Sequence, residues 1–282
     1  KEDTVELQGS GYYVDSEEIR TQNYSNVNRI LAKVPGVYVR EEDGSGNFPN
    51  ISLRGADGTR SEKTTVMEDG ILSAPATYSA PGAYYSPRAG RMSGIEVLKG
   101  SSQIKYGPHT TGGVINYLST PIPEESHFYG RYTYGTDNTM LGHFHYGNTV
   151  DTVAGKFGYL FELFANTTDG FRGIQKGTGY AGSDNTGFEV YERMVKLSGE
   201  PNTALPQRFE FKYGYTDLDA DETYTGLAES DEVEGRDGAG GEGVSGGASA
   251  VGDLGGGVWS GGASFLKICI LGIFGDISSN LS

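Results

Sequence analysis

Two histidines with the spacing of a β-strand are the first candidates for chemistry in this sequence. His143 and His145 lie two residues apart, so in a strand both imidazoles point to the same face and can share one metal ion. The chain has only four histidines, and no carboxylate lies beside this pair in the sequence. We therefore expect no metal site, and an ordinary strand position for both histidines.

Two other patterns imitate functional sites without meeting their requirements. Residues 217–222 contain four carboxylates, as at the start of a calcium-binding loop, but Glu222 occupies the sixth position, where an EF-hand needs glycine. The twelfth position is Ala228 instead of a bidentate glutamate. Residues 243–247 read G-x-S-x-G inside a glycine-rich tract, without the strand–turn–helix context of a serine nucleophile. We expect no catalytic residue and no enzyme activity.

The composition excludes two further classes of protein. With 22 Lys+Arg against 37 Asp+Glu, the net charge of −15 argues against a nucleic-acid partner. The mean hydropathy is −0.43, and the longest apolar run, Ile268–Phe274, is far shorter than the roughly 20 residues of a membrane-spanning helix. The 45 glycines and 19 tyrosines are instead typical of outer-membrane barrels, and the single cysteine cannot form an internal disulfide.

The elements of the first 120 residues predict a mixed α+β domain. Ser25 or Asn26 can cap a helix whose apolar stripe is Val27, Ile30 and Leu31, and which Pro35-Gly36 ends. Short apolar runs bounded by glycine, asparagine and proline predict strands around this helix. These strands are Val37–Val39, Ile51–Arg54, Thr64–Glu68, Ile95–Leu98 and Val114–Leu118.

After Pro123 the pattern changes to longer segments with period-two alternation. In Lys156–Leu163 the aromatic and aliphatic side chains alternate with more polar ones, as a transmembrane barrel strand requires. A soluble antiparallel sandwich uses the same alternation, so periodicity alone leaves both open. We expect a turn at Gly147-Asn148-Thr149. The predicted strands are His127–Tyr134, Met140–Tyr146, Val153–Ala165, Phe188–Leu197 and Phe209–Tyr215.

Beyond Gly226 the strand pattern stops. Glu229–Asp253 is first acidic and then rich in glycine, alanine and serine. Two interpretations stay open: a natural disordered extension, or a C-terminus that does not belong to the preceding gene, as after a frameshift. We favour the second.

Five segments, taken in order, resemble the plug domain of TonB-dependent outer-membrane receptors. Ala74–Met92 is similar to the ferric-citrate branch of that family, and the resemblance extends over residues 30–225. The resemblance implies a 22-stranded barrel filled by the plug, of which this chain holds only the first strands. The five segments are Ile30–Val39 (ILAKVPGVYV), Ile51–Gly55 (ISLRG), Val66–Gly70 (VMEDG), Ile95–Gly107 (IEVLKGSSQIKYG) and Thr111–Thr120 (TGGVINYLST).

On this resemblance the fold class is an α+β plug domain followed by the start of an antiparallel transmembrane β-barrel that is incomplete in this chain. The implied function is uptake of a ferric siderophore or a ferric-citrate-like chelate in the Gram-negative outer membrane. The partners are the TonB protein, the chelate and outer-membrane lipid. No cofactor is expected, since iron arrives within the transported chelate. The alternative is a soluble plug-type module that binds ligand or signals without transport.

The expected organisation has four parts. A TonB-box-like segment occupies residues 1–9, and the plug domain occupies residues 10–123. Partial barrel strands fill residues 124–225, and the glycine-rich aberrant or disordered tail is residues 226–282.

The resemblance also suggests three groups of site residues. A TonB box that adds a strand to its partner is expected at Asp3, Thr4, Val5, Glu6 and Leu7; a frayed, inert terminus is the alternative. An anionic chelate is expected to bind Arg60, Lys63, Tyr78, Tyr84 and Tyr85, unless these are solvated charges and packed rings. Charged contacts between plug and barrel are expected at Arg54, Glu96 and Lys99, with ordinary strand-end charge as the alternative.

Overall fold

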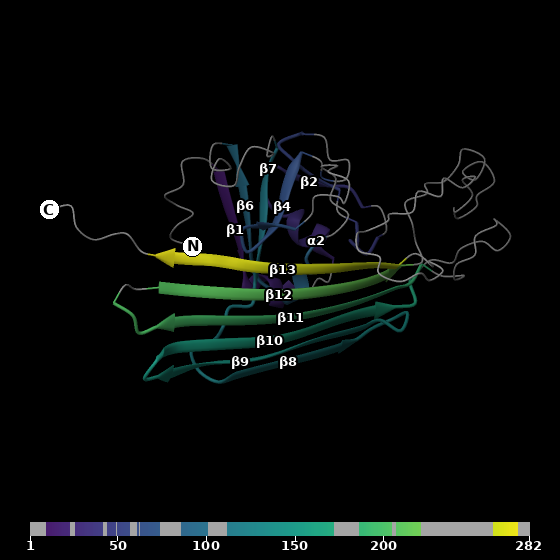
Figure 1. Ribbon diagram of the computed structural model, residues 1–282. Helices are drawn as coiled ribbons and strands as arrows, with labels where there is room; N and C mark the ends of the chain where they lie inside the picture. Colours follow the sequence, from purple (N-terminus) through teal and green to yellow (C-terminus); the bar gives the residue numbers. More distant parts are fainter. Residues whose placement is uncertain are drawn as a thin grey trace, which may run out of the picture. The chain divides into compact units, whose positions relative to one another are not determined.

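The structure is a computed structural model whose contacts divide the chain into two units, Lys1–Thr120 and Pro121–Ser282 (Figure 1). This division lies three residues before the predicted end of the plug domain at residue 123. Each unit has its own sheet. The described residues are 10–22, 26–41, 44–48, 50–56, 61, 63–73, 86–100, 112–171, 186–204, 207–220 and, for the backbone alone, 262–275.

The first unit is built on a five-stranded mixed sheet in the order β1-β6-β7-β4-β5. Strands β4 and β7 run parallel, and the other neighbours are antiparallel. A separate antiparallel pair is made by β2 (Val37–Val39) and β3 (Ile51–Leu53). The strands of the main sheet are β1 (Ser10–Asp15), β4 (Thr64–Glu68), β5 (Ile71–Leu72), β6 (Met92–Lys99) and β7 (Gly113–Ser119).

The predicted helix forms where its capping signal lies. Helix α2 (Val27–Leu31) begins after Asn26, whose side chain accepts a hydrogen bond from the Asn28 amide at 2.8 Å. Ile30 and Leu31 are buried in a core that also contains Ile51 and Ile95. The sequence analysis did not predict β1, helix α1 (Ser16–Gln22) or the short 3-10 helix η2 (Ala89–Arg91). In the described part of the chain no helix has the length and apolar character needed to cross a membrane.

The second unit is a six-stranded antiparallel sheet in the order β13-β12-β11-β10-β9-β8, so every strand pairs with its neighbour in sequence (Figure 1). Strands β8 and β13 do not pair with each other, and the sheet formed by the described strands is therefore open. The strands are β8 (His127–Tyr134), β9 (Met140–Thr152), β10 (Gly155–Thr168), β11 (Phe188–Pro201), β12 (Gln207–Ala220) and β13 (Gly262–Gly275).

The second sheet extends beyond the strands predicted from the sequence in two places. The turn predicted at residues 147–149 is wrong, because β9 continues through them to Thr152 and turns at Val153 and Ala154. The hydroxyl of Thr152 donates to the Gly155 carbonyl at 2.8 Å and fastens this turn. Within the predicted aberrant or disordered tail, residues 262–275 form β13, which pairs with β12. The rest of the tail lies outside the described residues.

The two faces of this sheet have opposite chemistry. On one side, the aromatic face, large apolar side chains are exposed: Phe161 is 51% and Leu163 is 55% accessible. On the other side, the polar face, charged groups are buried. Glu162, which lies between Phe161 and Leu163 in the sequence, is only 2% accessible. This pattern inverts that of soluble proteins and is typical of barrel strands with an apolar exterior. The buried polar residues of the polar face are His143, His145, Glu162, Asn166, Glu192, Lys196, Lys212 and Thr216.

Candidate functional site

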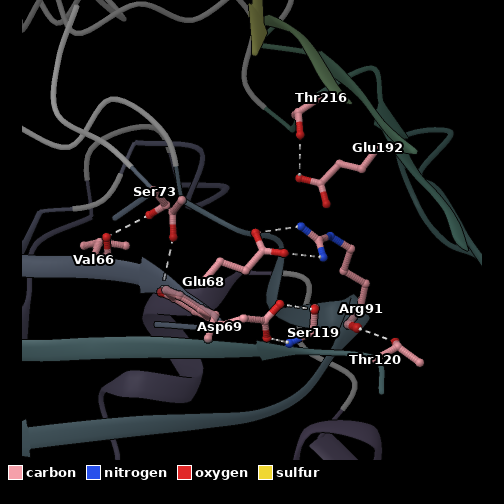
Figure 2. A network of polar contacts seen from close by, with 11 residues as sticks. Val66, Glu68, Asp69, Ser73, Arg91, Ser119, Thr120, Glu192 and Thr216 are labelled. Carbon is pink, nitrogen blue, oxygen red and sulfur yellow. Dashed lines mark hydrogen bonds and ion pairs between the residues drawn. The ribbon is translucent and has the colours of Figure 1, made fainter. Parts of the chain in front are cut away.

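A buried ion pair lies at one end of the first sheet. Glu68 ends β4 and Arg91 immediately precedes β6, and both are almost inaccessible, at 2% and 5%. The two guanidinium nitrogens of Arg91 each donate to one carboxylate oxygen of Glu68 at 3.1 Å (Figure 2). This two-bond geometry satisfies both charges, which is the condition for burying them. Glu68 lies in the VMEDG segment, but neither residue is among the site residues predicted from the sequence.

Asp69 and Gly70, the two residues after β4, form hydrogen bonds with residues of β7. Asp69 accepts hydrogen bonds from the amide of Ser119 at 2.9 Å and from its hydroxyl at 2.5 Å (Figure 2). The Asp69 amide donates to the Tyr117 carbonyl, and the Gly70 amide donates to the Asn116 side chain, both at 2.8 Å. The MEDG segment thus holds β4, β5 and β7 in one arrangement.

Two of the three predicted plug–barrel residues lie together. Lys99 donates to the Pro35 carbonyl at 2.5 Å, and a Cβ atom built at Gly100 would lie 2.9 Å from an Arg54 guanidinium nitrogen. Burial lowers the pKa of Lys99 below its ordinary value, and the neighbouring Arg54 charge lowers this pKa further. Arg54 and Lys99 therefore form a cation pair at the ends of the ISLRG and IEVLKG segments. Among the described residues Arg54 has no ion-pair partner.

The third predicted contact residue has a partner inside its own unit. Glu96, in the middle of β6, accepts a hydrogen bond from the Asn116 side chain of β7 at 2.9 Å. Because Asn116 also accepts from Gly70, Glu96 belongs to the network around the MEDG turn. The proposed role of Arg54, Glu96 and Lys99 toward the barrel stays a prediction.

The predicted ligand-binding and coupling residues fall mostly outside the described structure. Lys63 is described, and it is exposed directly before β4. The other ligand candidates, Arg60, Tyr78, Tyr84 and Tyr85, and the coupling residues Asp3, Thr4, Val5, Glu6 and Leu7 lie outside the described residues.

The histidine pair has a carboxylate neighbour in space that is not adjacent in the sequence. Glu162 of β10 is the register partner of His145 on β9, and its carboxylate lies 2.8 Å from Nε2 of His143. One ligand atom from each of the three side chains lies within 4.8 Å of the others. Glu162 is distant from the histidines in the sequence, and only the β9–β10 register brings it to them.

Comparisons with known proteins agree with this architecture. Residues 3–114 match the family described as "TonB-dependent Receptor Plug Domain". A curated relative, the vitamin B12 transporter BtuB of Vibrio vulnificus (strain YJ016), is 30% identical over 160 residues, which are 56% of this chain and 25% of the relative.

Solved receptors share the fold over both units. The unliganded ferric citrate transporter FecA superposes with a TM-score of 0.65 at 22% identity, over 83% of this chain and 34% of FecA. The siderophore receptor PirA of Acinetobacter baumannii gives a TM-score of 0.57 at 18% identity, over 78% of this chain and 33% of PirA. This chain thus spans between a quarter and about a third of these relatives.

The predicted fold class is confirmed: an α+β plug followed by the antiparallel strands of a partial barrel. The relatives named above are receptors and transporters, not enzymes. The first unit thus matches the plug domain of TonB-dependent receptors over residues 3–114, and the fold of the solved receptors continues through the second unit.

Proposed function

We propose that this chain is the plug and the first wall strands of an outer-membrane receptor that takes up a ferric siderophore or a ferric-citrate-like chelate. The observation that carries the proposal is the second sheet, whose aromatic side chains are exposed while its charged side chains are buried. Such a sheet is stable with its aromatic face against lipid and its polar face toward an aqueous or protein-filled lumen. Transport belongs to the longer receptor of which these strands form one part of the wall.

The plug acts by binding and movement, not by covalent chemistry. The Glu68–Arg91 pair and the Asp69–Ser119 hydrogen bonds keep the centre of the plug in one arrangement. The cation pair of Arg54 and Lys99 suits carboxylates on later barrel strands, which would hold the plug through contacts that separate during transport. Coupling to TonB takes place through residues 3–7, which add a strand to the partner's sheet.

The ligand is anionic on this proposal. Arg60 can bind a citrate carboxylate with two parallel hydrogen bonds, and Lys63 supplies a second positive charge. Tyr78, Tyr84 and Tyr85 add hydroxyl donors and flat ring surfaces around the chelate. A ferric chelate with exposed carboxylates fits this set better than a neutral one.

Equilibrium binding tests the ligand class. The full chain in detergent is titrated with ferric citrate, and with a neutral ferric hydroxamate for comparison. Arg60→Gln and Lys63→Gln should each weaken ferric citrate binding by about one to two orders of magnitude, since a hydrogen bond to a charged group contributes about 1.5–3 kcal/mol. Lys33→Gln is the matched control, since Lys33 is also exposed and makes only a 4.0 Å ion pair with Glu18. Equal effects of Lys33→Gln and Lys63→Gln, or a preference for the neutral chelate, would contradict the proposed site.

A second candidate is a soluble plug module that binds ligand without transport. It is favoured by the core of the first unit, which is built from its own residues, including Leu31, Ile51 and Ile115. Residues 1–120 alone, expressed without detergent, should then unfold cooperatively and bind ferric citrate as well as the full chain does. Loss of binding in this fragment, with a folded circular dichroism spectrum, would leave the receptor as the better proposal.

A further inference from the structure

Three metal-ligating side chains converge on the polar face of the second sheet. His143 and His145 project from β9 on the same side, and Glu162 projects from β10 directly opposite His145. Their exposed fractions are 5%, 6% and 2%, so all three are buried. Two imidazoles and one carboxylate are a ligand set that proteins use for zinc and for divalent iron.

The distances are close to those of a metal site. Nε2 of His143 lies 2.8 Å from the Glu162 carboxylate, and one ligand atom from each residue lies within 4.8 Å of the other two. A tetrahedral ion with bonds of about 2.0–2.2 Å holds its ligands about 3.4 Å apart. Side-chain rotations that move the ligand atoms by roughly 1 Å therefore suffice to close the site. The ion would replace the hydrogen bond between His143 and Glu162.

Neighbouring rings hold the two imidazoles in place. The Tyr129 ring of β8 stacks on His145 with centroids 5.0 Å apart and an interplanar angle of 15°. The same ring meets His143 edge-on at 5.2 Å, and Phe164 of β10 packs against His143 at 5.9 Å. Packed surroundings that fix ligand orientation raise metal affinity because less freedom is lost on binding.

We propose that His143, His145 and Glu162 bind a divalent first-row transition-metal ion of the zinc class on the polar face of strands β9 and β10. This site uses none of the residues proposed to bind the chelate, and it binds the bare ion instead of an iron chelate. With three protein ligands the ion keeps a fourth position for water or for a group of a ligand. The strand register creates the site, and it does not depend on the identity of the chelate.

Cobalt is the probe that tests the site. The full chain in detergent, without an affinity tag and with Cys269→Ser to remove the one thiol, is titrated with Co²⁺ and followed by visible absorption. We expect one Co²⁺ per chain with the intensified d–d bands that appear when Co²⁺ leaves octahedral coordination by water. One equivalent of Zn²⁺ should abolish these bands. A titration without this spectral change overturns the proposal, whatever the variants do.

Matched variants assign the ligands. Glu162→Gln, His143→Gln and His145→Gln should each weaken Co²⁺ binding by more than ~10–100-fold, the loss caused by removing even an outer-shell partner. Glu192→Gln is the control, because Glu192 is a buried carboxylate on the same face of β11, 3% exposed and hydrogen-bonded by Thr216. Circular dichroism confirms that each variant is folded. Unchanged affinity in folded Glu162→Gln, or an equal loss in Glu192→Gln, would refute the assignment.

Discussion

Removal of Arg91 is the sharpest test of how the plug is held together. In Arg91→Met the Glu68 carboxylate keeps its buried position, with 2% exposure, but loses both hydrogen bonds of 3.1 Å. Breaking a buried ion pair by removing one partner costs about 3–5 kcal/mol. Because the chain has two units, unfolding is not a single two-state event, and a local measurement is needed. Amide hydrogen exchange in β4, β6 and β7 provides it.

The expected change in exchange rate is large enough to distinguish the buried Glu68–Arg91 pair from an exposed ion pair. A loss of 3–5 kcal/mol accelerates exchange through plug opening by about two to nearly four orders of magnitude. Lys33→Met is the control, because its pair with Glu18 is 4.0 Å long and the two side chains are 47% and 33% exposed. Such an exposed pair is worth about 1 kcal/mol or less.

A double variant distinguishes lost pairing from lost packing. In Glu68→Leu with Arg91→Met both charges of this pair are removed together, and replacing a buried pair by apolar groups is often neutral. Protection of β4 and β7 should therefore return most of the way to its original level. If Arg91→Met exchanges no faster than Lys33→Met, or the double variant is worse than the single one, the reasoning about this ion pair is wrong.

Three further predictions concern other parts of the chain. Burial raises the pKa of the Tyr117 hydroxyl above its usual 10.0, so the folded plug keeps a proton that the unfolded chain releases above pH 10. The stabilisation of the plug by the protonated Tyr117 hydroxyl is present below pH 10. Above pH 10 the free energy that protects β7 from amide exchange should fall about 1.4 kcal/mol per pH unit more steeply than in Tyr117→Phe. Parallel pH profiles of the two proteins would contradict this. Gly113→Ala should destabilise the plug more than Gly55→Ala in urea titrations. Both glycines have positive φ, but a Cβ at Gly113 would also lie 2.6 Å from the backbone carbonyl oxygen of Leu98, whereas no described atom lies within 4 Å of one at Gly55. Phe161→Lys should reduce partition into lipid vesicles by about 2–4 kcal/mol if the aromatic face meets lipid, while an unchanged partition would contradict that placement.

Local signals were sufficient for much of the first unit. The Asn26 cap and the short apolar stripe of α2 act within a few residues, and β4 formed over the predicted range, Thr64–Glu68. The period-two pattern likewise predicted β8 from His127 to Tyr134.

Features that depend on strand pairing could not be predicted. Gly147 looked like a turn residue, but it lies inside β9, where a Cβ atom would be 2.7 Å from the Tyr159 carbonyl. Glycine at this position allows the neighbouring strand to approach closely, and it does not mark a turn. Glu162 became a neighbour of His143 only through the β9–β10 register, and Arg91 met Glu68 only after the sheet had brought the ends of β4 and β6 together.

The different strand orders of the two sheets have a consequence for the order of folding. In the second sheet each strand pairs with the one before it, so every pairing joins strands that are consecutive in the sequence. In the first sheet Ser10 pairs with Lys99, so β1 has no partner until almost the whole plug has been made. Closing so long a loop is slow. Until β6 is in place, the unpaired β1 can bind chaperones or pair with a wrong strand. The first sheet is therefore complete only when its own first strand has docked on β6, which comes from the far end of the same unit.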